Sequence, residues 1–185
     1  MANDFYDVGK IRQIANTLFL GWGYNFYRKE NQLRADDQLV CAKAAWLLGL
    51  AAQSVQAAEA ELRRRTIPPP TREKPFPDPA AMTSAQNLER LGKDIIAIEA
   101  RLHALPAPSQ DLMTLRYRQE AETLSRLIEA DERLVGLSEL LRSMLDGQPA
   151  ELVIDRYSDV QAGISAIRAT LVDREAILHS RSPES

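Results

Sequence analysis

Two pairs of glutamate and histidine are the residues of this sequence whose types and spacing could do chemistry. Glu99 precedes His103 by four residues, and Glu175 precedes His179 by the same interval. Residues four apart share one face of a helix, so the two pairs together could offer carboxylates and imidazoles to a divalent metal ion. The alternative is that each pair is solvated near the end of a helix, where the dipole favours a partly protonated histidine. We favour the solvated arrangement and keep a metal-binding helical enzyme as an alternative.

Other catalytic signatures are missing from the sequence. It contains no glycine-rich phosphate loop, no G-x-S-x-G nucleophile elbow and no H-E-x-x-H zinc motif. Because there are only two histidines, a general base would have to be a carboxylate. The single Cys41 excludes an internal disulfide. We therefore predict no catalytic residue and no cofactor, and we favour a non-catalytic protein over an enzyme.

Aromatic residues are concentrated at the N-terminus. Seven of the eleven fall in the first 27 residues, and their positions spread around a helix, so one core-facing stripe cannot hide them all. Aromatic residues and arginine dominate the energetics of protein interfaces, which favours a surface for a protein partner or a homo-oligomer. The alternative is that the aromatic residues form the core between helices. The predicted partner-binding residues are Phe19, Trp22, Tyr24, Phe26, Tyr27 and Arg28.

Five basic residues lie at the end of the second predicted helix and just beyond it. Arginines at a helix C-terminus complement the helix dipole, and this ordinary role accounts for most of them. The alternative is contact with a nucleic-acid backbone, as in a helical subunit of a ribonucleoprotein. The net charge of −3 argues against attraction of the whole molecule to nucleic acid. In this alternative the nucleic-acid-binding residues are Arg63, Arg64, Arg65, Arg72 and Lys74.

A proline-rich segment divides the chain. Residues 67–79 read IPPPTREKPFPDP, so six of thirteen are proline. Proline lacks a backbone donor and has a fixed φ, which excludes a helix or a central strand and favours extended polyproline II. We expect this segment to lie at the surface without regular structure. The three consecutive prolines, followed by Arg72, are also loosely similar to a proline-rich ligand for an aromatic groove.

Helical periodicity is clearest after the proline-rich segment. Leucine and isoleucine recur at alternating spacings of three and four between Leu88 and Leu105, and Thr83 with Gln86 fits a capping box before them. A second apolar stripe over residues 109–147 ends in a glycine that suits a C-cap. A third helix is predicted from Pro149 onwards, since proline is favoured in a first turn.

The predicted fold class is all-α, an antiparallel bundle of about five helices. Three long helices joined by short connectors run antiparallel to bury their stripes, and Ile95, Leu102 and Ile164 should be buried. The N-terminal segment adds two helices, over about residues 4–29 and 36–65, which need a further surface to cover them. The predicted organisation is an aromatic-rich helical hairpin over 1–66, a proline-rich linker over 67–82, an up-down-up, coiled-coil-like three-helix bundle over 83–180 and a tail over 181–185.

The composition, 45% hydrophobic and 26% charged, is typical of a soluble globular protein. The longest apolar run, Ala44–Ala52, is too short to span a membrane, and Asp4 and Asp7 precede any basic residue, unlike a signal peptide. We therefore expect a cytoplasmic protein without a transmembrane segment. Long amphipathic helices and the missing catalytic signatures predict a non-catalytic protein–protein interaction module, such as an adaptor or an assembly or scaffold subunit, that can also self-associate.

Overall fold

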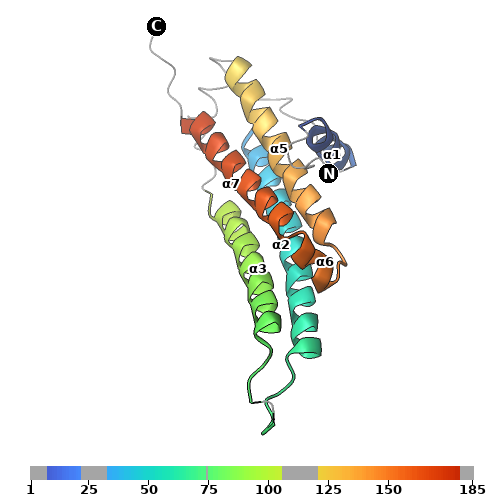
Figure 1. Cartoon of the computed structure of the whole chain (residues 1–185). Coiled ribbons are helices and arrows are strands. Elements are labelled where there is room, and N and C mark those ends of the chain that lie inside the picture. The colour runs from blue at the N-terminus through green and yellow to red at the C-terminus, as the bar shows by residue number, and fades with distance from the viewer. Residues whose placement is uncertain (1–7, 22–32, 74, 106–120, 180–185) are drawn as a thin grey trace.

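The computed structural model describes residues 8–21, 33–73, 75–105 and 121–179, and every regular element in these ranges is a helix (Figure 1). The predicted all-α class is confirmed for this part of the chain, where the helices pack against each other. The elements are α1 (Val8–Gly21), α2 (Leu33–Thr66), α3 (Pro79–Ala104), α5 (Ala121–Leu145), α6 (Ala150–Asp155) and α7 (Tyr157–His179).

Helix α3 begins at Pro79, four residues before the predicted capping box. Asp78 is its N-cap, because the carboxylate accepts hydrogen bonds from the backbone N–H groups of Ala80 and Ala81, both at 3.3 Å. Pro79 occupies the first turn, where its missing N–H has no cost. Thr83 lies inside the helix, and its hydroxyl donates to the carbonyl of Pro79 at 2.9 Å. The capping-box prediction is wrong because Asp78 and Pro79 already start the helix upstream.

The C-terminal helices differ from the prediction in one place. Gly147 follows α5 with a φ of 65°, the left-handed conformation that the predicted C-cap requires. The single helix expected after Pro149 is instead divided into α6 and α7 at Arg156, whose φ of −97° and ψ of 14° interrupt the regular geometry. Residues 106–120 include the predicted start of the second helix and lie outside the described residues.

Helix α2 is the central element of the fold. It forms an antiparallel hairpin with α3 and also packs extensively against α5, which in turn packs against α7 and α1 (Figure 1). Helix α1 therefore lies mainly on α5, whereas the predicted hairpin over 1–66 would pair it with α2. Helix α3 makes most of its contacts with α2 and few with α7. The helices of residues 83–180 thus surround a core that α2 completes.

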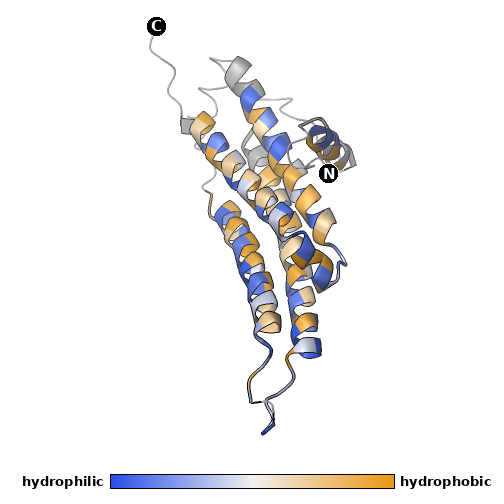
Figure 2. Ribbon diagram, viewed as in Figure 1, coloured by the Kyte–Doolittle hydropathy of each residue, from blue (hydrophilic) through white to orange (hydrophobic). Residues whose placement is uncertain are grey.

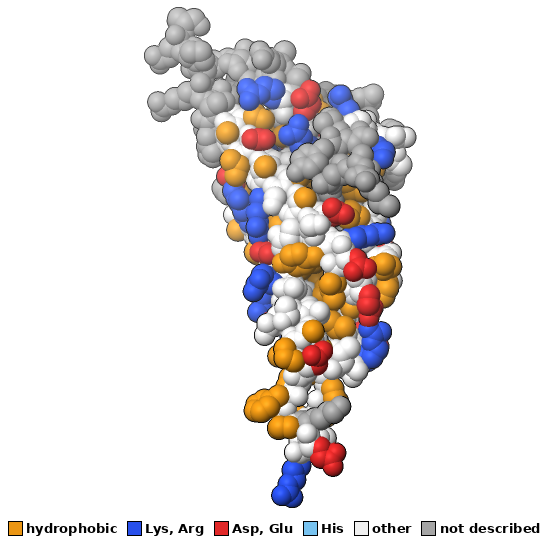
Figure 3. Space-filling view, in the orientation of Figure 1, with side chains coloured by type: hydrophobic (Ala, Val, Ile, Leu, Met, Phe, Trp, Pro, Cys, Tyr) orange, Lys and Arg blue, Asp and Glu red, His pale blue; other side chains and the backbone are white. Residues whose placement is uncertain are grey.

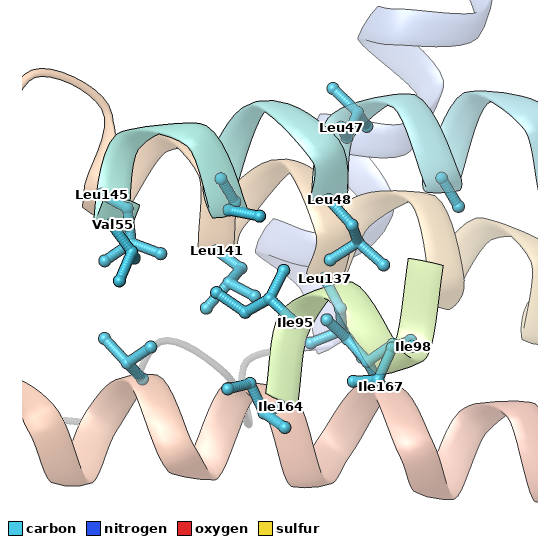
Figure 4. Close-up of a cluster of buried hydrophobic side chains, with 14 of the residues drawn as sticks. Leu47, Leu48, Val55, Ile95, Ile98, Leu137, Leu141, Leu145, Ile164 and Ile167 are labelled. Carbon is cyan, nitrogen blue, oxygen red and sulfur yellow. The ribbon is translucent and has the colours of Figure 1, made fainter. Parts of the chain in front are cut away.

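A single core joins the helices on both sides of the proline-rich segment. In Figure 4, labelled leucine, isoleucine and valine side chains from α2, α3, α5 and α7 point toward one another. Ile95, Leu102 and Ile164 are all buried, which confirms their predicted positions. On α2, small residues such as Ala44 and Ala51 are completely buried, and they allow neighbouring helices to approach closely.

The central position of α2 explains its apolar composition. The hydropathy colouring shows apolar residues along the inner sides of the helices and polar residues outside (Figure 2). By length and composition alone, the stretch Gln38–Thr66 is apolar enough to cross a membrane. Uninterrupted apolar runs, of which Ala44–Ala52 is the longest, do not reveal this property. Half of its most apolar window is buried inside the protein, as in the core helix of a bundle.

The proline-rich segment connects α2 to α3 and projects beyond the ends of both helices (Figure 1). Lys74 is not described, and the other residues of 67–78 contain no helix or strand. The predicted segment 67–79 is too long by one residue, because Pro79 already begins α3. Residues 68–73 and 75–78 are all exposed, as predicted for this segment. We call these two stretches the tip.

Helix α1 meets α5 at Gly136. A Cβ atom placed on this glycine would lie 2.5 Å from the carbonyl oxygen of Ile11 and 2.6 Å from its Cγ2, closer than real contacts allow. Gly92 of α3 is also buried, but a Cβ atom there would lie 3.7 Å from Cγ1 of Val55, an ordinary van der Waals contact. At Gly136, unlike at Gly92, an added methyl group collides with the backbone of a neighbouring helix.

We expect Gly136→Ala to destabilise the protein and Gly92→Ala to stabilise it. Both changes remove the cost of glycine in a helix interior, about 0.5–1 kcal/mol relative to alanine. At position 136 the methyl group also forces α1 away from α5, and such overpacking costs about 1–3 kcal/mol. Urea unfolding of the two variants measures the difference. Equal stabilisation by both would show that α1 does not sit against Gly136 in solution.

Candidate interaction site

The structure brings the ends of α3 and α7 together, and an arginine engages one of the predicted metal ligands there. Arg101 Nη2 donates to both carboxylate oxygens of Glu175, at 2.8 and 2.9 Å, so this carboxylate is engaged by an arginine. Glu99 lies against α2, and His103 is exposed in the last turn of α3. Among the described residues, no three His, Cys, Asp or Glu side chains are placed to hold a metal ion. The side chain of His179 is not described, so its role as a ligand stays a prediction.

The predicted partner-binding residues fall largely outside the described ranges. Phe19 lies in α1, but its side chain is not described. Whether the N-terminal aromatic residues belong to a core or to an interface therefore stays a prediction. The residues concerned in the stretch 22–32 are Trp22, Tyr24, Phe26, Tyr27 and Arg28.

Each of the three arginines predicted to contact nucleic acid at the end of α2 is paired with carboxylates. These pairs connect α2 to α3 and to α6, and they lower the positive potential that a phosphate would meet. Arg72 is exposed in the tip, and Lys74 lies outside the described residues. The pairs are Arg63 with Glu59 and, at 3.0 Å, with Glu89; Arg64 with Glu61; and Arg65 with Glu151.

A cluster of buried polar groups joins three helices inside the core. Arg174 Nε on α7 donates to Asp131 Oδ1 on α5 at 2.7 Å, and both side chains are buried. Burial, and after it the nearby charge of Asp131, raises the pKa of the Cys41 thiol on α2 to about 12. The thiol therefore stays protonated at neutral pH and is not prepared to act as a nucleophile. Because these groups are covered on all sides, the cluster positions helices and does not face a substrate.

A small hollow between α1 and α5 holds another group of charges. Its volume is about 140 Å³, and Ile11, Arg12, Glu129, Glu132 and Arg133 line it. Arg12 Nε and Glu132 Oε2 form an ion pair at 2.9 Å. Burial raises the pKa of Glu132, and the charge of Arg12 acts in the opposite direction. The ion pair attaches α1 to α5 at this hollow.

The most distinctive surface lies on α2, opposite its buried side. Trp46 is 54% exposed in the middle of the helix, and Leu39, about two turns earlier, is also exposed. When successive residues are placed 100° apart around the helix axis, Lys43 is the only charged residue on this side of α2 between Leu39 and Ala60. We call this surface the Trp46 face, and its residues are Leu39, Ala42, Trp46, Leu50, Gln53, Ala57 and Ala60, of which Leu50 is half-buried and the others are exposed.

Lys43 and Trp46 interact at the edge of the Trp46 face. The Lys43 ammonium nitrogen lies 5.6 Å from the centre of the indole ring, within the range of a cation–π interaction. This contact restricts the rotamers of the indole, so less side-chain entropy is lost when another surface covers the ring. The indole of Trp46 is therefore partly restricted in the free protein.

The Trp46 face was not predicted from the sequence. On a helical wheel, Trp46 lies opposite Ala44, Leu48 and the other buried residues of α2. Because α2 is rich in alanine, its apolar residues surround the helix, and the sequence does not reveal which side a neighbour covers.

Comparisons of the chain with protein-family models, with curated proteins and with solved structures found no match in any of the three. A proposal for the function therefore depends on the surface and the core of this chain.

Proposed function

We propose that the protein is a non-catalytic helical interaction module, an adaptor or an assembly or scaffold subunit, that binds another protein molecule through the Trp46 face. The observation that supports this most strongly is the exposure of Trp46. Covering apolar surface contributes about 25 cal/mol per Å², and tryptophan is among the residues that most often dominate binding energy. A partner that covers the indole would therefore gain a large share of its affinity there.

The shape and charge of the Trp46 face suit an amphipathic helix of the partner. From Leu39 to Ala60 the face is about 32 Å long at 1.5 Å per residue. Its three bulky residues lie in the N-terminal half, and Ala57 and Ala60 lie toward the other end. A second helix can therefore fit large side chains around Trp46 and approach closely at Ala57. Lys43, at the edge of the face, suits a partner carboxylate.

The remaining helices support the Trp46 face in this proposal. We infer that α3, α5 and α7 follow the up-down-up course predicted for residues 83–180, with α2 completing the bundle of a cytoplasmic protein. The Arg101–Glu175 ion pair supports this course, because it places the last turns of α3 and α7 at the same end. Potentially reactive groups of the described chain, such as Cys41 and Glu175, are buried or ion-paired, which favours binding over catalysis.

Photocrosslinking followed by titration tests the proposal. A photoreactive amino acid at position 46 of the full-length chain captures the partner in the native cell, and the purified partner is then titrated against the Trp46→Gln and Val172→Gln variants. Val172 is a matched control, because it is also 54% exposed in a helix, α7. We expect Trp46→Gln to weaken binding about 30-fold or more, as for a central hot spot, and Val172→Gln to change it little.

Light scattering of the free protein completes the test. Self-association that Trp46→Gln abolishes would identify the partner as a second copy of the chain. Both variants should retain the melting temperature of the unmodified protein, because each side chain is largely in solvent. If neither a partner nor self-association depends on Trp46, the proposal is wrong.

A further inference from the structure

The side chains of the Trp46 face differ in size between its two halves. Leu39, Trp46 and Leu50 lie in the N-terminal half, and Ala57 and Ala60 lie toward the other end. A parallel copy of α2 would set the bulky halves against each other, whereas an antiparallel copy sets the bulky half of each face on the small half of the other. The shape of the face therefore favours an antiparallel copy of itself.

Two opposite charges lie along one edge of this side of α2. Glu61 follows Lys43 by eighteen residues, which is five turns of helix, so the two residues have the same position around the helix axis. In an antiparallel pair related by a two-fold axis, each edge of one helix meets the same edge of the other. Lys43 of each copy then meets Glu61 of the partner subunit, and the arrangement forms two equivalent ion pairs.

The charges and the shape of the face require the same register. The Lys43–Glu61 pairs form when the two-fold axis crosses α2 at the level of Ala52, midway between the two residues. Trp46 then lies opposite the turn of the partner helix that begins at Ala57. The indole, 54% exposed in the single chain, is thus covered where small side chains leave room for it.

Both charged groups can form such a pair from the positions that they occupy in the single chain. The Glu61 side chain is 58% exposed and pairs with Arg64, which is 75% exposed, so solvent reaches both. A carboxylate accepts several hydrogen bonds, which allows Glu61 to engage a second cation. The Lys43 ammonium has three donors and can stay near the indole while it donates to a carboxylate.

Two copies of the chain would repel each other little at long range. The net charge is only −3 over 185 residues. Among the described residues, Figure 3 shows acidic and basic side chains interspersed over the visible face of the molecule. Repulsion between copies grows with net charge and with areas of a single sign, so it does not oppose association here.

We propose that the partner of the Trp46 face is a second copy of this chain, in a two-fold antiparallel dimer of α2 helices stabilised by Trp46 and by reciprocal Lys43–Glu61 ion pairs. This inference rests on the proposed function, because it names the molecule that covers the same face. The tip follows the C-terminal end of α2, so the two tips of the dimer would project from opposite ends of the α2 pair.

Sedimentation equilibrium of the full-length protein and of two charge-reversal variants tests the proposal. We expect the unmodified chain to form dimers. Lys43→Glu and Glu61→Lys each set like charges against one another in both pairs, so each should raise the dimer Kd about 10-fold or more. An equal mixture of the two variants should recover the affinity of the unmodified protein, because the two chains then carry opposite charges at all the paired positions.

Two further variants serve as controls. The double variant, Lys43→Glu with Glu61→Lys, exchanges the two charges and should dimerise like the unmodified protein. Arg90→Glu makes the same change in net charge as Lys43→Glu, at an exposed position of α3, and should leave the dimer Kd unchanged. Circular dichroism checks that every variant keeps its helix content.

The dimer proposal is wrong if the unmodified protein sediments as a monomer at the highest concentration that stays soluble. It is also wrong if the single variants dimerise as well as the unmodified protein, or if their mixture does not recover association. A different protein captured at position 46, whose binding Trp46→Gln weakens, would overturn only the choice of a second copy and leave the Trp46 face as a binding site. If no association depends on Trp46, both proposals fail.

Discussion

Replacing Asp131 with alanine is expected to destabilise the protein by about 3–5 kcal/mol, the cost of removing a carboxylate that compensates a buried cation. Asp131 accepts a hydrogen bond of 2.7 Å from Arg174 Nε, and both side chains lie inside the core. The Arg174 guanidinium cannot reach water unless α7 separates from α5. Urea unfolding gives the change in the free energy of unfolding.

An exposed pair between the same two helices provides a matched control. Arg133 Nη1 and Asp173 Oδ2 are 3.9 Å apart on the surface of α5 and α7, so Asp173→Ala should cost less than about 1 kcal/mol. Replacing both buried partners, in Asp131→Leu with Arg174→Met, should restore much of the stability because no charge stays buried. If Asp131→Ala costs no more than Asp173→Ala, the Asp131–Arg174 pair is not buried in solution.

Two adjacent isoleucines on α3 should differ strongly in their contribution to stability. Ile95 is 0% exposed within the core, whereas Ile96 is 38% exposed. We expect Ile95→Ala to cost about 2–5 kcal/mol, because it removes buried carbon atoms and leaves a cavity. Ile96→Ala should cost less than about 1 kcal/mol, since the lost contact is partial and alanine favours the helix.

The two isoleucine variants together separate the effect of burial on stability from the effect of helix propensity. Both change the same residue type, one position apart, in the middle of the same helix. Thermal and urea unfolding of each variant give the two free-energy changes. Equal costs would mean that α3 is rotated about its axis relative to the structure in Figure 4.

Properties that depend on residues close together in the chain could be predicted from the sequence. The spacing of apolar residues from Leu88 to Leu102 predicts both the helix and its buried side, because the period of a helix is set by the local backbone. Prolines exclude regular structure over residues 67–78 for an equally local reason. The C-cap at Gly147 after α5, which has the left-handed conformation, was also predicted from the local sequence.

The candidate site was less predictable. The aromatic residues predicted to bind a partner, including Trp22, lie outside the described residues or, for Phe19, have no described side chain, so that prediction stays open. Lone exposed residues such as Trp46 and Phe76 have no sequence motif. Their availability depends on whether another part of the protein covers them.

Local sequence patterns thus indicated most of the helices, the C-cap at Gly147 and the proline-rich tip, and the tertiary structure decided which helices are neighbours. Helix α1 lies on α5 because Gly136 allows the backbone of Ile11 to come close, and no periodicity within α1 indicates this contact. Asp131 and Arg174 are 43 residues apart and meet only when α5 and α7 pack together. The physical reason is that an apolar stripe shows that a helix must be covered, whereas the complementary shape and charge of distant segments select what covers it.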